Sequence, residues 1–201
     1  LNVELRAQKE MAHGLIPVGH TLAAEQIKIA GEKANHGLAA GASRAQTRLP
    51  KLNIKENKNN RNQLIISGQN FELTFNRAEG RLTSYRFHNL ELLKEGPLPN
   101  FWRAPTDNDF GNRMPERLKV WREASQKREV KVFNASKDKA GQVVVKVEFY
   151  LPAVEAIYAV TYTIARDGVV KIDNEFKPQN PEKLPEIPRV GLLLAMPEGF
   201  E

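Results

Sequence analysis

Strict alternation of apolar and polar residues is the feature that most constrains the fold of this chain. Between residues 143 and 151 every second residue is apolar, namely Val143, Val145, Val147, Phe149 and Leu151. Successive side chains of a β-strand point to opposite faces, so this stretch would present five apolar side chains to one face of a sheet. The segment is therefore predicted to be a strand that covers a hydrophobic core.

Similar patterns predict hairpins elsewhere. Residues 71–75 and 82–87 are predicted to pair around a turn at 76–80, which ends in glycine. Asp167-Gly168 separates the alternating segments 158–164 and 170–176, and Asp-Gly between two such segments is a strong hairpin signal. Shorter strands are predicted at 64–66, 90–93, 130–133 and 190–196.

One helix is expected among these strands. Pro115 suits a first helical position, and Leu118, Trp121 and Ser125 share a face up to about Lys127. The fold class is therefore predicted to be all-β: a large antiparallel β-sandwich with one short helix.

The chain is expected to contain parts of two domains. Residues 1–30 contain alternating segments at 2–5 and 21–29, with a turn at 14–19. Too few strands are present there for a stable sheet, so they are interpreted as the last strands of another sandwich. Residues 31–62 lose the alternation and are predicted to be a linker with one short strand near 52–54. The second domain is predicted to span 63–201.

Composition excludes several classes of protein. No segment approaches the roughly 18 apolar residues of a membrane span. The net charge of +6 comes from basic residues spread along the chain among 24 acids, which argues against nucleic acid as a partner. The absence of cysteine excludes disulfides and leaves the compartment open between cytoplasm and periplasm. The chain begins within an alternating segment, so we expect it to be part of a longer protein.

Residues 97–112 differ from the rest of the chain. Three prolines, two aromatic residues, an arginine and the run Asp107-Asn108-Asp109 occur together, and a long structured loop is predicted there. Aromatic, carboxylate, amide and guanidinium groups together suit a sugar. The alternative is that the Asp and Asn side chains cap the loop's own turns, while Trp102 fills the edge of the core.

Three other chemistries are weak in this sequence. A calcium loop that began at Asp107 would need glycine at its sixth position and glutamate at its twelfth, where this chain has Asn112 and Leu118. Asp107 and Asp109 lie too close in the sequence to be the acid and nucleophile of a glycosidase. The four histidines show no metal-ligand spacing, so no metal site is predicted.

The segment from Asn100 to Asn112, NFWRAPTDNDFGN, is very similar to one in the C-terminal domain of bacterial family 2 β-galactosidases. The resemblance extends to Phe71–Tyr85, Leu92–Pro97, Leu118–Trp121 and, upstream, Gly19–Gln26. It implies the N-terminal part of a galactose-mutarotase-like supersandwich domain over 63–201, truncated at its end, and the last strands of an immunoglobulin-like sandwich over 1–30. Residues 31–48 match no part of the family pattern.

The resemblance also implies a function. The parent enzyme would be a homo-oligomeric, retaining hydrolase of terminal β-D-galactose. Its two catalytic glutamates and the ligands of its magnesium and sodium ions would lie on a barrel domain outside this sequence. The barrel and a galactoside would be the partners, and this chain by itself would need no cofactor and hydrolyse nothing.

Within that family the loop approaches the galactose site, so the resemblance implies which residues would serve it. The residues assigned to the substrate-site loop are Arg103, Asp107, Asn108, Asp109 and Gly111, and the loop anchors are Phe101 and Trp102. We expect Arg103 and at least one carboxylate to face outward and Gly111 to give backbone freedom. Two alternatives remain open: a stand-alone carbohydrate-binding module, and an enzyme of the aldose-epimerase type, for which no His–Glu pair is evident.

Overall fold

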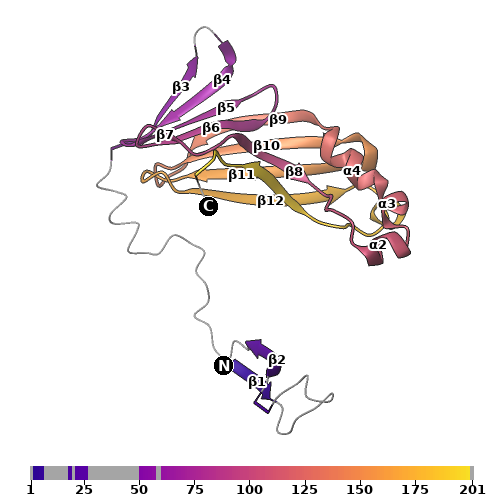
Figure 1. Ribbon diagram of the computed structural model, residues 1–201. Helices are drawn as coiled ribbons and strands as arrows, with labels where there is room; N and C mark the ends of the chain where they lie inside the picture. The colour runs from indigo at the N-terminus through magenta and orange to yellow at the C-terminus, as the bar shows by residue number, and fades with distance from the viewer. Residues whose placement is uncertain (1, 7–17, 20, 27–49, 58–59, 200–201) are drawn as a thin grey trace. The chain divides into compact units, whose positions relative to one another are not determined.

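The computed structural model describes residues 2–6, 18–19, 21–26, 50–57 and 60–199 (Figure 1). The chain divides into two compact units, residues 1–44 and 45–201.

The first unit contains an antiparallel pair of strands. β1 (Asn2–Arg6) pairs with β2 (Thr21–Gln26), and Asn2 lies opposite Gln26. Gly19 has φ +86° in the turn that precedes β2. Both strands were predicted, although residues 27–29 of the second lie outside the described residues, as do residues 31–49 of the predicted linker. The immunoglobulin-like assignment stays a prediction.

The second unit contains three antiparallel sheets. The five-stranded sheet has the order β3 (Asn53–Asn57), β4 (Asn60–Ser67), β5 (Phe71–Asn76), β6 (Arg81–Phe87) and β7 (Leu90–Glu91). The four-stranded sheet has the order β12 (Val170–Pro178), β11 (Ala156–Ile164), β10 (Val143–Leu151) and β9 (Glu129–Lys137). The two-stranded sheet pairs β8 (Glu95–Asn100) with β13 (Gly191–Ala195).

The helical segments are short. They are α2 (Asp107–Gly111), α3 (Met114–Arg117) and α4 (Lys119–Gln126), together with the 3₁₀ turns η1 (Pro152–Val154) and η2 (Pro181–Lys183). In the described part of the chain no helix has the length and apolar character needed to cross a membrane.

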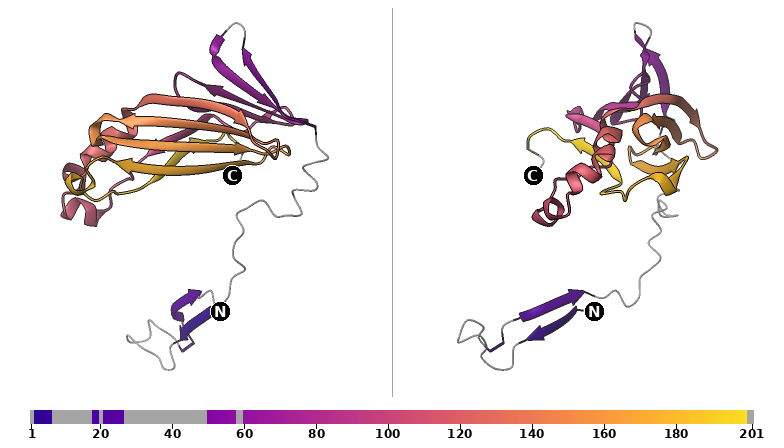
Figure 2. Two further views of the ribbon diagram at one scale, coloured as in Figure 1. Left: turned by 180° about the vertical axis from the view of Figure 1, so that it is seen from behind. Right: turned by 90° about the vertical axis from the view of Figure 1, so that its right-hand side faces the viewer.

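The five-stranded and four-stranded sheets pack face to face (Figures 1 and 2). On β10, the five alternating apolar residues from Val143 to Leu151 are buried, as the sequence predicts. Phe75 of β5 is fully buried between the layers, with its ring centroid 5.2 Å from that of Tyr162 on β11 and 6.2 Å from that of Phe133 on β9. The sandwich is therefore held by interleaved aromatic and branched side chains.

Polar contacts also tie the two layers together. The Tyr85 hydroxyl donates a 2.6 Å hydrogen bond to the carbonyl of Gly168, in the hairpin turn between β11 and β12. Lys137 Nζ donates a 2.7 Å bond to the carbonyl of Leu52. Gly168 has φ +96°, in the left-handed region that favours glycine.

The remaining part of the four-stranded sheet is covered by β8, β13 and α4. Phe101, which follows β8, is fully buried, and its ring centroid lies 5.3 Å from Tyr158 of β11 and 5.5 Å from Phe176 of β12. Trp121 of α4 is also fully buried, 5.9 Å from Phe101. These aromatic rings form a second half of the core, next to the segment that contains the candidate site.

The all-β antiparallel fold and both principal hairpins are confirmed: β5 pairs with β6, and β11 with β12. Three details differ from the prediction. The five-stranded sheet begins at β3, with Leu52 buried, before the predicted domain start at residue 63. The single predicted helix over 115–127 is broken at Leu118 into α3 and α4, and the predicted loop at 97–112 contains a further helix, α2.

The third difference is β8, which was predicted to be part of a loop because of its prolines. Pro97 and Pro99 lie in a strand that pairs only with β13, among the described strands. Proline is tolerated in a strand with one open edge, because its missing N–H is not needed there. Gly96 lies directly against β6, where a Cβ atom would overlap the carbonyl oxygen of Leu82.

This close approach predicts different effects of alanine at two glycines. Gly96→Ala should lower the free energy of unfolding by at least about 3 kcal/mol, because the strand must move away from the Leu82 backbone. Gly111→Ala is the control, since nothing lies within 4 Å of its Cβ position. It should change stability by less than about 1 kcal/mol. Urea unfolding measures both, and equal effects would contradict the packing of β8 on β6.

Candidate functional site

The segment with the sugar-like composition is anchored at its start by the core. Phe101 is fully buried, and its backbone N–H donates a 2.8 Å bond to Ser125 Oγ of α4. Trp102 is half-buried, and its backbone N–H donates to Asn100 Oδ1 at 3.1 Å. Trp102 lines a cavity of about 240 Å³ with residues of β8, α4 and β13, among them Arg122 and Leu193. The two predicted anchors thus differ: Phe101 is a core residue, and Trp102 lies at the core's edge.

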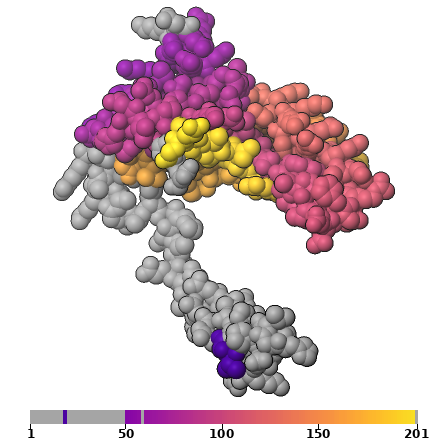
Figure 3. Space-filling view, viewed as in Figure 1, coloured from indigo at the N-terminus to yellow at the C-terminus, as the bar shows by residue number. Residues whose placement is uncertain are grey.

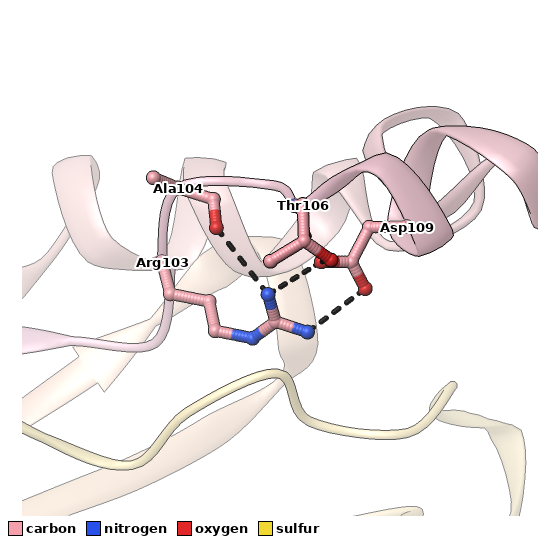
Figure 4. Close-up of polar contacts among 4 residues, drawn as sticks. All are labelled: Arg103, Ala104, Thr106 and Asp109. Atoms are coloured by element: carbon pink, nitrogen blue, oxygen red, sulfur yellow. Dashed lines mark hydrogen bonds and ion pairs between the residues drawn. The ribbon is translucent and has the colours of Figure 1, made fainter. Parts of the chain in front are cut away.

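Arg103 and Asp109 form a bidentate ion pair across the segment (Figure 4). Arg103 Nη1 lies 2.5 Å from Asp109 Oδ2, and Arg103 Nη2 lies 2.8 Å from Asp109 Oδ1. Arg103 Nη1 also contacts the carbonyl of Ala104 at 3.3 Å. The planar guanidinium matches both oxygens of a carboxylate, which gives such pairs a fixed geometry.

Asp109 also closes the first turn of α2. Its Oδ2 accepts 2.8 Å bonds from both the backbone N–H and the hydroxyl of Thr106, the residue that caps the helix. A side chain in the first turn that reaches back to the capping residue's N–H is half of a capping box. Asp109 is only 7% exposed. Its carboxylate therefore joins the start of the segment to the short helix at its tip.

These contacts set the charge states of the pair. Hydrogen bonds from Arg103 and Thr106 hold the pKa of Asp109 far below its usual range. The hydrogen bond to Asp109 raises the pKa of Arg103. Asp109 is thus ionised at every pH at which the protein would work, and it cannot donate a proton as a general acid.

The side chains beside Asp109 on α2 face solvent. Asp107 and Asn108 are exposed, and Phe110 is 63% exposed, which is unusual for so large an apolar side chain. Arg113, which follows the helix, has φ +60° and pairs with Glu116 at 2.6 Å. The tip of the segment therefore presents a carboxylate, an amide and an aromatic ring on a short helix held by a partly buried ion pair.

Gly111 does not use the backbone freedom expected of it. It is the last residue of α2, and its φ is outside the left-handed region. Its Cβ position is open, so an alanine would fit there. The residue with a left-handed backbone is Arg113, two positions further on.

The structure separates the predicted site residues into two groups. Arg103 and Asp109 face one another, not outward, whereas Asp107 and Asn108 are open to solvent. Sequence reasoning did not single out Thr106 or Phe110. The spacing Thr106-x-x-Asp109 is a helix-capping pattern that could have identified the inward carboxylate. No sequence pattern would have shown that Phe110 is exposed.

The described residues do not fit a metal ion. Among them there is no group of three histidine, aspartate or glutamate side chains that could hold one. Asp109, the most shielded carboxylate of the segment, already has its oxygens occupied by Arg103 and Thr106. No step of a reaction is therefore assigned to a metal held by this part of the chain.

Comparison with known proteins shows the class to which this fold and segment belong. Residues 67–201, which contain most of the sandwich and the whole candidate site, match the family model for the β-galactosidase small chain. The chain belongs to the β-galactosidase small chain family, and the resemblance seen in NFWRAPTDNDFGN is confirmed.

Several proteins named β-galactosidase are similar to this chain. That of Priestia megaterium is 34% identical over all 201 residues, which cover 18% of its own length. That of Lactobacillus delbrueckii subsp. bulgaricus is 32% identical over 67% of this chain and 13% of its own length. A β-galactosidase small subunit of Latilactobacillus sakei is 40% identical over 31% of this chain and 20% of its own length. The chain thus spans about a fifth or less of these relatives.

The inward carboxylate predicts a stability effect at one aspartate and not at its neighbour. Asp109→Ala should lower the melting temperature by on the order of 5 °C, because it leaves Arg103 unpaired and opens the first turn of α2. Asp107→Ala, the matched control, removes an exposed carboxylate two residues away and should leave the melting temperature within about 1 °C. Differential scanning calorimetry measures both, and equal melting temperatures would contradict the ion pair's role.

The lowered pKa of Asp109 also predicts a pH dependence. A carboxyl group whose folded pKa is depressed stabilises the fold above its unfolded pKa, and that stabilisation is lost as pH falls toward the folded value. The loss should begin below about pH 4, the ordinary range for aspartate. The urea concentrations at the midpoint of unfolding, measured for the unsubstituted chain and for Asp109→Asn, should therefore converge as pH is lowered through that range. A constant difference down to pH 2 would show that the stabilisation does not depend on ionised Asp109.

Proposed function

We propose that this chain is a non-catalytic, substrate-site part of a β-galactosidase. The parent would be a retaining enzyme of glycoside hydrolase family 2 that acts on terminal β-D-galactose. Within it, the tip of the segment, residues 107–112, would form part of the wall at the mouth of the galactose site. The catalytic glutamates and the magnesium and sodium ligands would belong to the barrel domain, which is the partner of this surface.

The observation that carries this proposal is the contrast within one tripeptide. Asp109 is held inward by four polar contacts, whereas the side chains of Asp107 and Asn108 on the same short helix make no hydrogen bond to the described part of the chain. The inward residue gives the tip a fixed shape. The outward residues then offer hydrogen-bonding groups to a ligand at a defined position, with little conformational freedom left to lose on binding.

Asp107 and Phe110 complement one another on the exposed face of α2. Residues three apart in a helix are neighbours on its surface, so the carboxylate lies beside the exposed aromatic ring. Such a pair suits a sugar, because the ring covers the apolar C–H face and the carboxylate accepts hydrogen bonds from hydroxyl groups. We therefore assign Asp107, Asn108 and Phe110 as the substrate-facing residues, and Arg103 and Asp109 as the residues that position them.

Asp109 cannot act as the catalytic acid in this proposal. Asp109 is kept ionised by Arg103. The chemistry of glycoside hydrolysis needs a carboxylic acid that retains its proton near neutral pH, opposite a second carboxylate. The contribution of this chain is then to substrate affinity and not to proton transfer.

The parent enzyme provides the test. Phe110→Ala and Asp107→Ala should each raise KM for a chromogenic β-galactoside by about threefold to tenfold with kcat nearly unchanged, as expected for lost ground-state contacts. Val169→Ala is the control for loss of an exposed apolar side chain, since Val169 is 49% exposed in the hairpin turn between β11 and β12. It should leave both constants unchanged.

Steady-state kinetics distinguish the outcomes, provided that each variant has the same melting temperature as the unsubstituted enzyme. Unchanged KM in both tip variants would remove the tip from the galactose site. A fall in kcat alone would also contradict the proposal, because it would place these residues in the chemical step.

A further inference from the structure

A cleft is lined by residues of the β4–β5 and β6–β7 turns and of the adjoining strands. Figure 1 shows β7 at the end of the second unit opposite α2. Its volume is about 350 Å³, within the usual range for sites that take small molecules. Besides Ser67, the polar side chains that line it are Gln69, Asn70, Glu72, Arg86, His88 and Asn89. None of these residues belongs to the substrate-site segment.

The cleft is built on a rigid frame. His88 and Asn89 have φ +48° and +65°, the pair of positive values found in a tight hairpin turn. The His88 N–H donates a 2.8 Å bond to the carbonyl of Asn70, which ties the two turns together. Beneath them lies the ring of Phe71, packed so closely that a Cβ atom at Gly68 would overlap it.

The polar groups that face the cleft are not used by the fold. The side chains of Gln69, Glu72 and Arg86 make no hydrogen bond or ion pair to the described part of the chain, although Glu72 and Arg86 are direct partners across β5 and β6. The His88 ring is exposed and held edge-on by Phe87, with 4.6 Å between centroids. A carboxylate, a guanidinium, amides and an imidazole thus line one cleft, and the charged groups among them have no hydrogen bond or ion pair within the described part of the chain.

We infer that this cleft binds a neutral saccharide, as a second carbohydrate site separate from the proposed galactose site. Each sugar hydroxyl both donates and accepts hydrogen bonds, which matches a lining that offers acceptors at Glu72 and donors at Arg86. An anion would be repelled by Glu72 and a cation by Arg86. The exposed His88 ring, which contacts the ring of Phe87, can cover the apolar face of a pyranose.

This inference goes beyond the proposed function, because it uses residues at the other end of the unit. The two can fail independently. If the tip variants showed no change in KM, the inference about the cleft would still stand. The cleft is tested by ligand binding to the chain itself, without catalysis.

Two-dimensional amide NMR on the full 201-residue chain provides the test, with lactose and inorganic phosphate as separate probes. Lactose should shift the amide signals of residues 67–72 and 86–89 with a saturable dependence, whereas phosphate should not. Arg86→Ala and Glu72→Gln should each raise the dissociation constant for lactose by about tenfold, as expected for loss of a charge-assisted hydrogen bond. Arg61→Ala, which removes an exposed arginine from the opposite end of β4, is the control and should leave binding unchanged.

Either of two results would overturn the inference. One is phosphate, and not lactose, shifting the cleft signals, which would make this an anion site. The other is the absence of saturable lactose shifts at residues 67–72 and 86–89 up to concentrations of about 100 mM, beyond which a site of this size has no useful affinity. Folding of each variant is verified by the unchanged amide signals of β10 and β11.

Discussion

The packing of the second unit depends on the inner face of β11, which is the face turned toward the core. Its fully buried residues Tyr162 and Tyr158 lie four positions apart on the same face of the strand. Tyr162 meets Phe75 of the five-stranded sheet, and Tyr158 meets Phe101 beside the candidate site. Burial raises the pKa of Tyr158 to about 12, so both rings remain neutral core residues. One strand therefore joins two halves of the core that are far apart in sequence.

This arrangement explains how an irregular segment acquires a defined position. β8 and β13 lie on the surface seen in Figure 3, where Leu193 and Leu194 of β13 are exposed. From β8 the chain turns inward at Phe101, which is enclosed by Trp121, Tyr158 and Phe176. Arg103 follows two residues later and meets Asp109. The tip is thus only a few residues from a fully buried aromatic ring, and the ion pair limits the motion that remains.

The sequence predicts the strands in which apolar and polar residues alternate and the hairpins whose turns have a typical turn sequence. The alternation from Val143 to Leu151 and the Asp167-Gly168 turn needed no knowledge of distant contacts. β8 could not be predicted in this way, because its prolines argue against a strand unless one edge is known to be open. In the candidate site, the Thr106-x-x-Asp109 spacing marks Asp109 as a helix-capping residue and so separates it from Asp107, but the pairing of Asp109 with Arg103 is seen only in the structure.

That distinction determines which residues remain for function. A carboxylate that is 7% exposed must keep its partner, because removing the partner would leave a charge without either water or a counter-ion. Asp109 therefore cannot turn toward a ligand without losing its bonds to Arg103 and to the capping residue Thr106. The side chains of Asp107, Asn108 and Phe110 have no such partner to keep. Because they are exposed, they contribute no more to the stability of the fold than smaller polar side chains would. In the proposed function, the exposed ring of Phe110 beside Asp107 is the surface that the galactoside would cover.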